Sequence, residues 1–145
     1  MNVALKNPAD LVGRIGVDPS SSLLLIDTPE TLERLLAGGR DPGRPLEAVT
    51  ETRLRSVKRE FDTVILWRED RIGSEALLAA AAKRLAPTGR IWVVTAMRKV
   101  MGPRTPAVHR LARPDVEKAF AKSGLRLDGE ARFTAWHVGY RFSRV

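Results

Sequence analysis

Three short runs of the chain are apolar at every position, and they constrain the fold more than any other feature. The runs are Leu23–Ile26, Val64–Trp67 and Ile91–Val94. A strand without a polar face must be covered on both sides, which is typical of parallel strands between two layers of helices. Helical patterns separate the runs, so the sequence predicts strands that alternate with helices.

The first of these helices has matching signals at both ends. Thr28 is the expected N-cap, Pro29 occupies the expected first helical position, and Gly38 or Gly39 is the expected stop. Three leucines between these ends form the apolar stripe that would pack on the sheet. A capped amphipathic helix is therefore expected directly after the first apolar run.

Two further helices follow the other apolar runs. The pattern predicts one from Ser74 to Pro87, with Leu85 on its apolar stripe, and one that begins after Arg113 and closes at Gly124. The region between the first helix and the second apolar run is less regular. It predicts a short strand over 46–50 and a basic helical crossover over 52–60.

After Gly124 the apolar residues alternate with polar or small ones, as in antiparallel strands with one wet face. Together the patterns predict six strands in a single domain that spans residues 1–145. The expected fold is α/β, a Rossmann-like doubly wound three-layer sandwich. Its sheet is expected to be mixed and mainly parallel, with an antiparallel strand pair at the C-terminal end.

Composition bounds the function classes. The chain has 145 residues, no cysteine and a formal charge of +8. The absence of cysteine excludes thiolate catalysis and cysteine-based metal sites. His109 and His137 lack the spacing of a metal site and are expected to be surface or packing residues. No stretch is apolar enough for a membrane span, so we expect a cytoplasmic protein with no metal and no membrane contact.

Several segments together resemble a known family. The order FDTVILW, helix, LAPTGRIWVVTA, helix and two final strands is similar to the later half of class I S-adenosylmethionine-dependent methyltransferases. With LVGRIGVDPSSSLLLIDTPETLERLL and the tail WHVGYRFSRV added, the chain also resembles a family of small bacterial proteins of unknown function. The resemblance implies a methyltransferase-like fold and carries no established activity with it.

The turn after the first strand argues against a cofactor. A class I methyltransferase needs glycines there, because only glycine lets the backbone approach the ligand closely. This chain has Asp27-Thr28-Pro29-Glu30 instead, which contains a proline without a backbone donor and two acids. The turn is therefore interpreted as a structural helix start. Asp27 and Glu51 remain the candidate cofactor-binding residues, since an acid beyond the second strand could accept hydrogen bonds from ribose hydroxyls.

The loop after the second apolar run gives no better sign of catalysis. It has the sequence Arg68-Glu69-Asp70-Arg71 and lacks the Asn/Asp-Pro-Pro-aromatic pattern of amine methyltransferases. The simplest interpretation is a solvated loop with local ion pairs. No catalytic residue is predicted from it.

A long basic segment lies at the same edge of the predicted sheet. Residues 95–113 contain no acid, and their basic residues are candidate anion-binding groups: Arg98, Lys99, Arg104, Arg110 and Arg113. Such a rim loop could bind a phosphate-bearing ligand or nucleic acid. It could equally be a solvated insertion.

These observations lead to one main hypothesis and two alternatives. We expect a non-catalytic Rossmann-like binding or interaction domain that uses the basic rim loop and holds no cofactor. The first alternative is a divergent S-adenosylmethionine-dependent methyltransferase that uses Glu51. The second is a nucleic-acid-binding accessory protein. The alternating strand near residues 136–142 could also pair with a second copy as an edge strand, which would give a homodimer.

Overall fold

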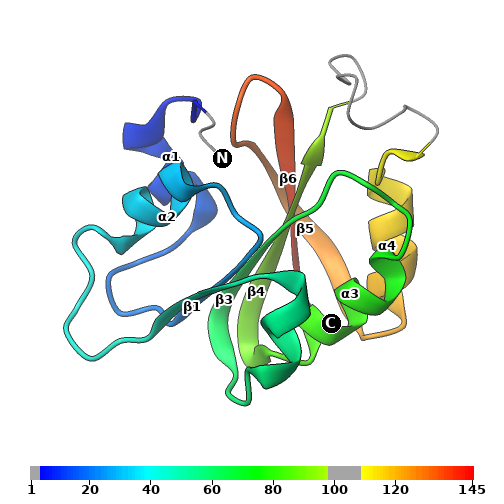
Figure 1. Ribbon diagram of the computed structural model, residues 1–145, viewed down its shortest axis with the longest axis horizontal. Coiled ribbons are helices and arrows are strands. Elements are labelled where there is room, and N and C mark those ends of the chain that lie inside the picture. The colour runs from blue at the N-terminus through cyan, green and yellow to red at the C-terminus, as the bar shows by residue number, and fades with distance from the viewer. Residues whose placement is uncertain (1–3, 98–108) are drawn as a thin grey trace.

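The computed structural model describes residues 4–97 and 109–145, which form one mixed sheet between two layers of helices (Figure 1). The strands are β1 (Leu23–Ile26), β2 (Leu46–Val49), β3 (Phe61–Trp67), β4 (Leu85–Ala96), β5 (Leu125–Arg132) and β6 (His137–Arg144). The helices are α1 (Pro8–Ile15), α2 (Glu30–Ala37), the 3₁₀ helix η1 (Glu51–Ser56), α3 (Ser74–Ala82) and α4 (Arg113–Ala121).

The six strands lie in the order β2-β1-β3-β4-β6-β5. The first four run parallel to one another, whereas β6 runs antiparallel to both β4 and β5. The predicted fold class, six strands with a C-terminal antiparallel pair, is confirmed. The chain leaves β1 for β2 on one side and later adds β3 on the other, so the topology switches between β1 and β3.

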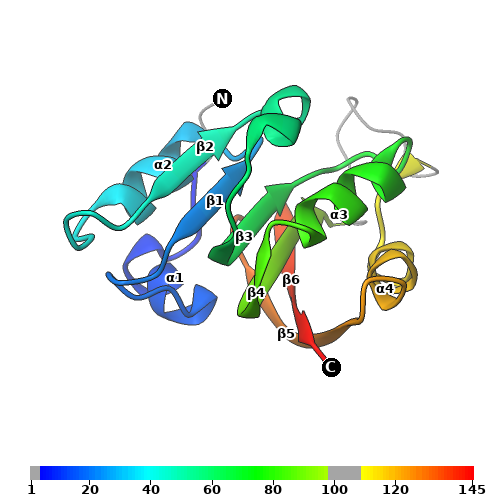
Figure 2. The ribbon, with the colours of Figure 1, turned by 90° about the horizontal axis from the view of Figure 1, so that it is seen from below.

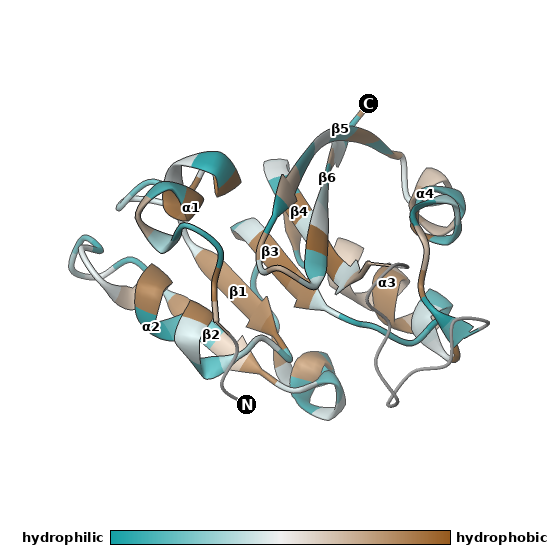
Figure 3. Ribbon diagram, turned by 90° about the horizontal axis from the view of Figure 1, so that it is seen from above, coloured by the Kyte–Doolittle hydropathy of each residue, from teal (hydrophilic) through white to brown (hydrophobic). Residues whose placement is uncertain are grey.

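Both faces of the parallel strands are covered, as their sequences require. The four residues of β1 are fully buried, and they alternate between the two cores of the protein. Leu23 and Leu25 pack with α1 and α2, whereas Leu24 and Ile26 face the core under α3 and α4. Figures 2 and 3 show these two helix pairs on opposite faces of the sheet, with the apolar strands between them.

The N-terminal helix α1 is an element that the sequence patterns did not predict. It is tied to the sheet by one buried hydrogen bond, which the indole Nε1 of Trp92 donates to the carbonyl of Ile15 at 2.9 Å. Leu11 and Ile15 are fully buried in the same core. The tryptophan of the central strand therefore fixes where α1 lies. No described helix is long and apolar enough to cross a membrane.

Two predicted helix boundaries are wrong. The helix α2 begins at Glu30, with Pro29 at the N-cap position and no side-chain cap, so Thr28 does not cap it. The helix α3 ends at Ala82, because Leu85 begins β4 and pairs with Phe61 of β3. Pairing with a neighbouring strand therefore overrides the helical periodicity that extends to Pro87 in the sequence. The predicted basic crossover over 52–60 is reduced to the short η1.

The strand near residues 136–142 does not lie at the edge of the sheet. It is β6, which is hydrogen-bonded to β4 on one side and to β5 on the other. It therefore cannot offer a free edge to a second copy. The edge strand on this side of the sheet is β5, whose polar side chains, Arg126, Asp128, Glu130 and Arg132, are exposed. An edge that carries charges of both signs resists pairing with another chain.

The glycine of β6 at position 139 is required by packing. A Cβ on Gly139 would overlap the ring of Phe133 and would lie 3.0 Å from Cε3 of Trp92. We expect Gly139→Ala to lower the free energy of unfolding by about 2 to 3 kcal/mol, as overpacked cores do. Gly13 in α1 is the matched control, because a Cβ there meets nothing within 4 Å. Gly13→Ala should raise stability by about 0.5 to 1 kcal/mol. Urea unfolding measures both, and equal effects would contradict this packing.

Candidate functional site

The topology brings several polar residues to one rim of the sheet. In open α/β sheets, ligands bind beyond the carboxyl ends of the strands at the point where the strand order reverses. Here that point lies between the ends of β1 and β3. Asp27 follows β1, Glu51 follows β2 by two residues, and Arg68 follows β3 directly. The structure therefore gathers both predicted cofactor-binding acids and one base at the switch point.

Asp27 makes a tight turn of the kind that usually favours glycine. Its φ of 55° lies in the left-handed region, which aspartate tolerates better than most residues. Its backbone N–H donates to the carbonyl of Val49 at 2.9 Å, which fixes the turn against β2. The absence of glycine therefore does not prevent the tight turn. The sequence interpretation that this turn argues against a cofactor site therefore loses its main support.

The carboxylate of Asp27 faces the segment after β2. Its Oδ1 accepts a hydrogen bond from the backbone N–H of Glu51 at 3.3 Å. Partial burial raises the pKa of Asp27 above its ordinary value, and this outweighs the hydrogen bond from Glu51 and the nearby charge of Arg68, which both lower it. A carboxylate kept in a partly desolvated place is a typical feature of a binding site.

Glu51 and Arg68 form an ion pair across the switch point. Nη1 of Arg68 donates to Oε2 of Glu51 at 2.9 Å, and Nε of Arg68 donates to the carbonyl of Asp70 at 2.9 Å. Nη2 donates to the carbonyl of Ile72. The prediction of a solvated loop with local ion pairs at residues 68–71 is wrong, because Arg68 reaches a residue 17 positions away.

Glu69 makes the second long-range contact of this loop. Its Oε2 lies 2.8 Å from Nε2 of His137, at the start of β6. The other ring nitrogen of His137 lies 2.8 Å from Oγ1 of Thr134, and the ring packs on Trp67 with centroids 4.7 Å apart. His137 is 8% exposed. The sequence interpretation missed its link to Glu69, since 68 residues separate the two.

The hydrogen bonds of Thr134 indicate which nitrogen of His137 carries the proton. Oγ1 of Thr134 already accepts the N–H of Trp136 at 2.9 Å. Within the described residues its own hydrogen has no acceptor other than Nδ1 of His137. Nδ1 is therefore the acceptor in the neutral ring, and Nε2–H donates to the Glu69 carboxylate. The rim thus holds a carboxylate oriented by a buried histidine.

The predicted anion-binding residues are not gathered into one site in the described part of the chain. Arg98, Lys99 and Arg104 lie outside the described residues. Arg110 donates to the carbonyl of Ala96 at 3.2 Å, and Arg113 pairs with Glu117 on its own helix at 3.2 Å. Anion binding by this segment, to a phosphate-bearing ligand or to nucleic acid, stays a prediction. No metal-binding cluster of histidines and acids occurs in residues 4–97 and 109–145.

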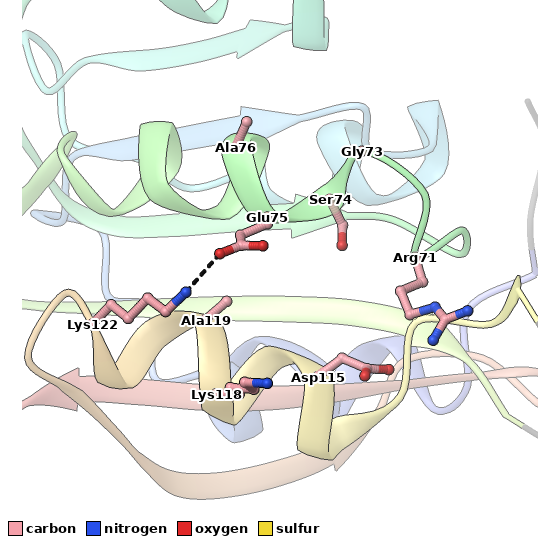
Figure 4. Close-up of a pocket in the computed structure, with 9 residues that line it drawn as sticks. All are labelled: Arg71, Gly73, Ser74, Glu75, Ala76, Asp115, Lys118, Ala119 and Lys122. Carbon is pink, nitrogen blue, oxygen red and sulfur yellow. Dashed lines mark hydrogen bonds and ion pairs between the residues drawn. The ribbon is translucent and has the colours of Figure 1, made fainter.

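A pocket of about 550 Å³ lies in the groove between α3 and α4 (Figure 4). It is lined by residues of both charge signs and by small residues: Arg71, Gly73, Ser74, Glu75, Ala76, Asp115, Lys118, Ala119 and Lys122. Glu75 and Lys122 pair across one end at 2.8 Å, and Asp115 accepts the backbone N–H of Ala112 at 3.0 Å. Most of this lining belongs to α3 and α4, whereas ligands of open α/β sheets bind beyond the carboxyl ends of the strands, so the switch point remains the better candidate.

Comparison with solved structures establishes the class of the fold. The chain is similar to TrmN from Thermus thermophilus, with a TM-score of 0.65, 15% identity, and coverage of 95% of this chain and 48% of that one. A SAM-dependent methyltransferase from Aquifex aeolicus gives 0.66 and 10% identity, with coverage of 96% and 90%. Magnesium protoporphyrin IX methyltransferase from Synechocystis, solved with bound SAM, gives 0.62 and 12% identity, with coverage of 95% and 78%. The fold is that of class I methyltransferases.

The chain spans about half the length of the Thermus protein and nine tenths of the Aquifex protein. No family model and no curated protein matches its sequence. The expectation of a non-catalytic binding domain is contradicted, because solved structures that share this fold, among them those from Aquifex and Synechocystis, are methyltransferases. The expected absence of a cofactor is not supported by these structures. They favour the methyltransferase alternative, which the glycine-free turn had placed second.

The environment of Asp27 generates a stability prediction. Its raised pKa means that the ionised carboxylate is disfavoured in the folded state. We expect Asp27→Asn to raise the melting temperature at neutral pH by about 1 to 2 °C, roughly 0.5 kcal/mol. Asparagine keeps the acceptor for the Glu51 N–H and tolerates the left-handed turn.

The sign of the pH dependence follows from the same shift. A raised folded pKa means that the unfolded chain loses its proton first, so stability falls as the pH rises through this range. The gain from Asp27→Asn should begin near the ordinary value of 3.8 and become constant once the pH exceeds the folded pKa. Calorimetric melting as a function of pH measures it. A gain that is equally large in strong acid would contradict this explanation.

The tautomer of His137 is a second prediction from this site. The chain has two histidines, so a His109→Gln variant assigns the signals in a nitrogen-15 imidazole spectrum. At mildly alkaline pH we expect His137 to show a protonated Nε2 and an unprotonated Nδ1. Thr134→Val should weaken this preference, because it removes the hydroxyl donor to Nδ1 and leaves only the Glu69 carboxylate to select Nε2–H. A protonated Nδ1 in the unaltered protein would contradict the proposed direction of the hydrogen bonds.

Proposed function

We propose that the chain is an S-adenosylmethionine-dependent methyltransferase whose cofactor site is the switch point between β1 and β3. The observation that carries this proposal is the placement of Asp27 and Glu51 at the ends of adjacent parallel strands, joined by the hydrogen bond from the Glu51 N–H. In a methyltransferase-like fold, this is the rim where a nucleoside-bearing cofactor binds.

The residues at this rim fit the chemistry of the cofactor. S-adenosylmethionine carries two ribose hydroxyls, an ammonium group and a sulfonium, all of which favour carboxylate partners. Glu51 is well placed for the hydroxyls because its side chain is 45% exposed and can reorient. Asp27 supplies a second carboxylate, and its left-handed backbone provides the tight turn that glycine provides elsewhere.

When bound, the cofactor supplies an electrophilic methyl group. The chain's own contribution to the reaction would then be to orient an acceptor and take up its proton. Glu69 suits this role, because His137 holds one oxygen of its carboxylate from the direction of β6. The pair lies at the carboxyl ends of β3 and β4, beside the proposed cofactor rim. We assign Glu69 to hold the proton and His137 to position it.

Isothermal calorimetry with S-adenosylmethionine and its demethylated product, S-adenosylhomocysteine, tests the proposal. We expect dissociation constants in the micromolar range for both. Glu51→Gln should weaken both by about tenfold, since it replaces a charged acceptor by a neutral one. Glu117→Gln is the matched control, because Glu117 is ion-paired with Arg113 on α4 and does not belong to the rim. Its affinity should equal that of the unaltered protein.

The decisive negative result is the absence of heat with either ligand at millimolar concentration in a protein that melts cooperatively. Binding that is unaffected by Glu51→Gln would separate the two parts of the proposal. It would leave cofactor binding in place and contradict the assigned rim. Both results can be read without knowledge of the methyl acceptor.

A further inference from the structure

Arg68 fills the switch point with a guanidinium that is held from three sides. Two of its donors go to backbone carbonyls of its own turn, at Asp70 and Ile72, and the third goes to the carboxylate of Glu51. Its side chain is 21% exposed, although it lies at the rim of the sheet. The turn between β3 and α3 therefore fixes the position of the guanidinium. Glu51 is its one partner from outside this turn among the three acceptors.

The contact with Arg68 uses an acid that the proposed function requires for the cofactor. Glu51 is the first residue of η1, and its side chain is 45% exposed, so it can turn away from Arg68 at little cost. The backbone N–H of Glu51 also donates to Oδ1 of Asp27. That contact holds the start of η1 in place while the carboxylate changes partners.

We infer that Arg68 competes with the cofactor for the Glu51 carboxylate and thereby sets the affinity of the site. This inference rests on the proposed function. A ribose diol offers two donors to one carboxylate, and the ion pair already occupies one oxygen and neutralises its charge. The guanidinium also joins the turn after β3 to the segment after β2, on either side of β1 in the sheet, at the rim where ligands of such sheets bind. Cofactor binding must therefore break the Glu51–Arg68 pair.

The competition predicts an unusual response to salt. The Glu51–Arg68 pair is partly exposed, so added salt weakens it. If binding must break this pair, salt lowers the cost of binding. Affinity for S-adenosylhomocysteine should then rise between low salt and about 0.5 M salt. A site in which Arg68 itself bound the ligand would lose affinity over the same range.

The test compares the unaltered protein with Arg68→Met, which keeps a long side chain but removes the charge and the hydrogen bonds. Calorimetry with S-adenosylhomocysteine should give about fivefold tighter binding to the variant, without the salt-dependent rise. Arg59→Met is the matched control, because Arg59 pairs with Glu47 on β2 at 3.5 Å and should leave affinity unchanged. Thermal melting of each variant verifies that it folds.

A second variant covers the case in which Arg68→Met does not fold. Arg68→Lys keeps the positive charge but cannot hold all three acceptors at once, so the pair with Glu51 should weaken. We expect it to bind S-adenosylhomocysteine more tightly than the unaltered protein and less tightly than Arg68→Met. Affinity equal to or below that of the unaltered protein would overturn the inference.

A ligand without a carboxylate separates the alternative roles of Arg68. Methylthioadenosine has the ribose but lacks the amino acid end. Competition predicts that Arg68→Met tightens binding of both ligands. Loss of affinity for S-adenosylhomocysteine alone would mean that Arg68 binds the ligand carboxylate, and loss for both would mean that Arg68 orients Glu51 for binding. Either loss of affinity, or no change in affinity, overturns the inference. If neither the unaltered protein nor any variant binds either ligand, the proposed function is contradicted and the inference falls with it.

Discussion

Coverage of both faces of the central parallel strands is the constraint on which the rest of the structure depends. The strand β1 has no polar side chain, so helices must pack on each side of the sheet, and the chain must cross from one face to the other between strands. These crossovers place the carboxyl ends of β1, β2 and β3 at the same rim. The apolar residues of these strands are buried between the helix layers, so the polar residues that follow the strands lie together at this rim.

The fold could be predicted from the sequence because burial leaves a direct pattern in it. Fully apolar runs such as Val64–Trp67 identify strands covered on both faces, and the alternation after Gly124 identifies a sheet with one wet face. The errors occur where a distant partner decides the local structure. Leu85 fits a helix by periodicity and joins β4 because Phe61 lies beside it, and α1 depends on a hydrogen bond from Trp92.

The candidate site could be predicted only in part, and the reason is the same. Asp27 and Glu51 could be found from their places after strands, since strand ends are visible in the sequence. The roles of Arg68 and Glu69 could not be found, because they are adjacent charged residues and the sequence does not show which distant residue each one contacts. Only the structure separates them, since Arg68 reaches back to η1 and Glu69 reaches forward to β6. Residue type alone carries no information about these directions.

The left-handed backbone of Asp27 also bears on how such a turn can change over time. Aspartate and glycine codons differ by a single base, and both residues tolerate this conformation, so the turn can exchange one for the other without refolding. A search for the glycine signature would therefore overlook this chain, although its backbone makes a left-handed turn of the kind that glycine allows.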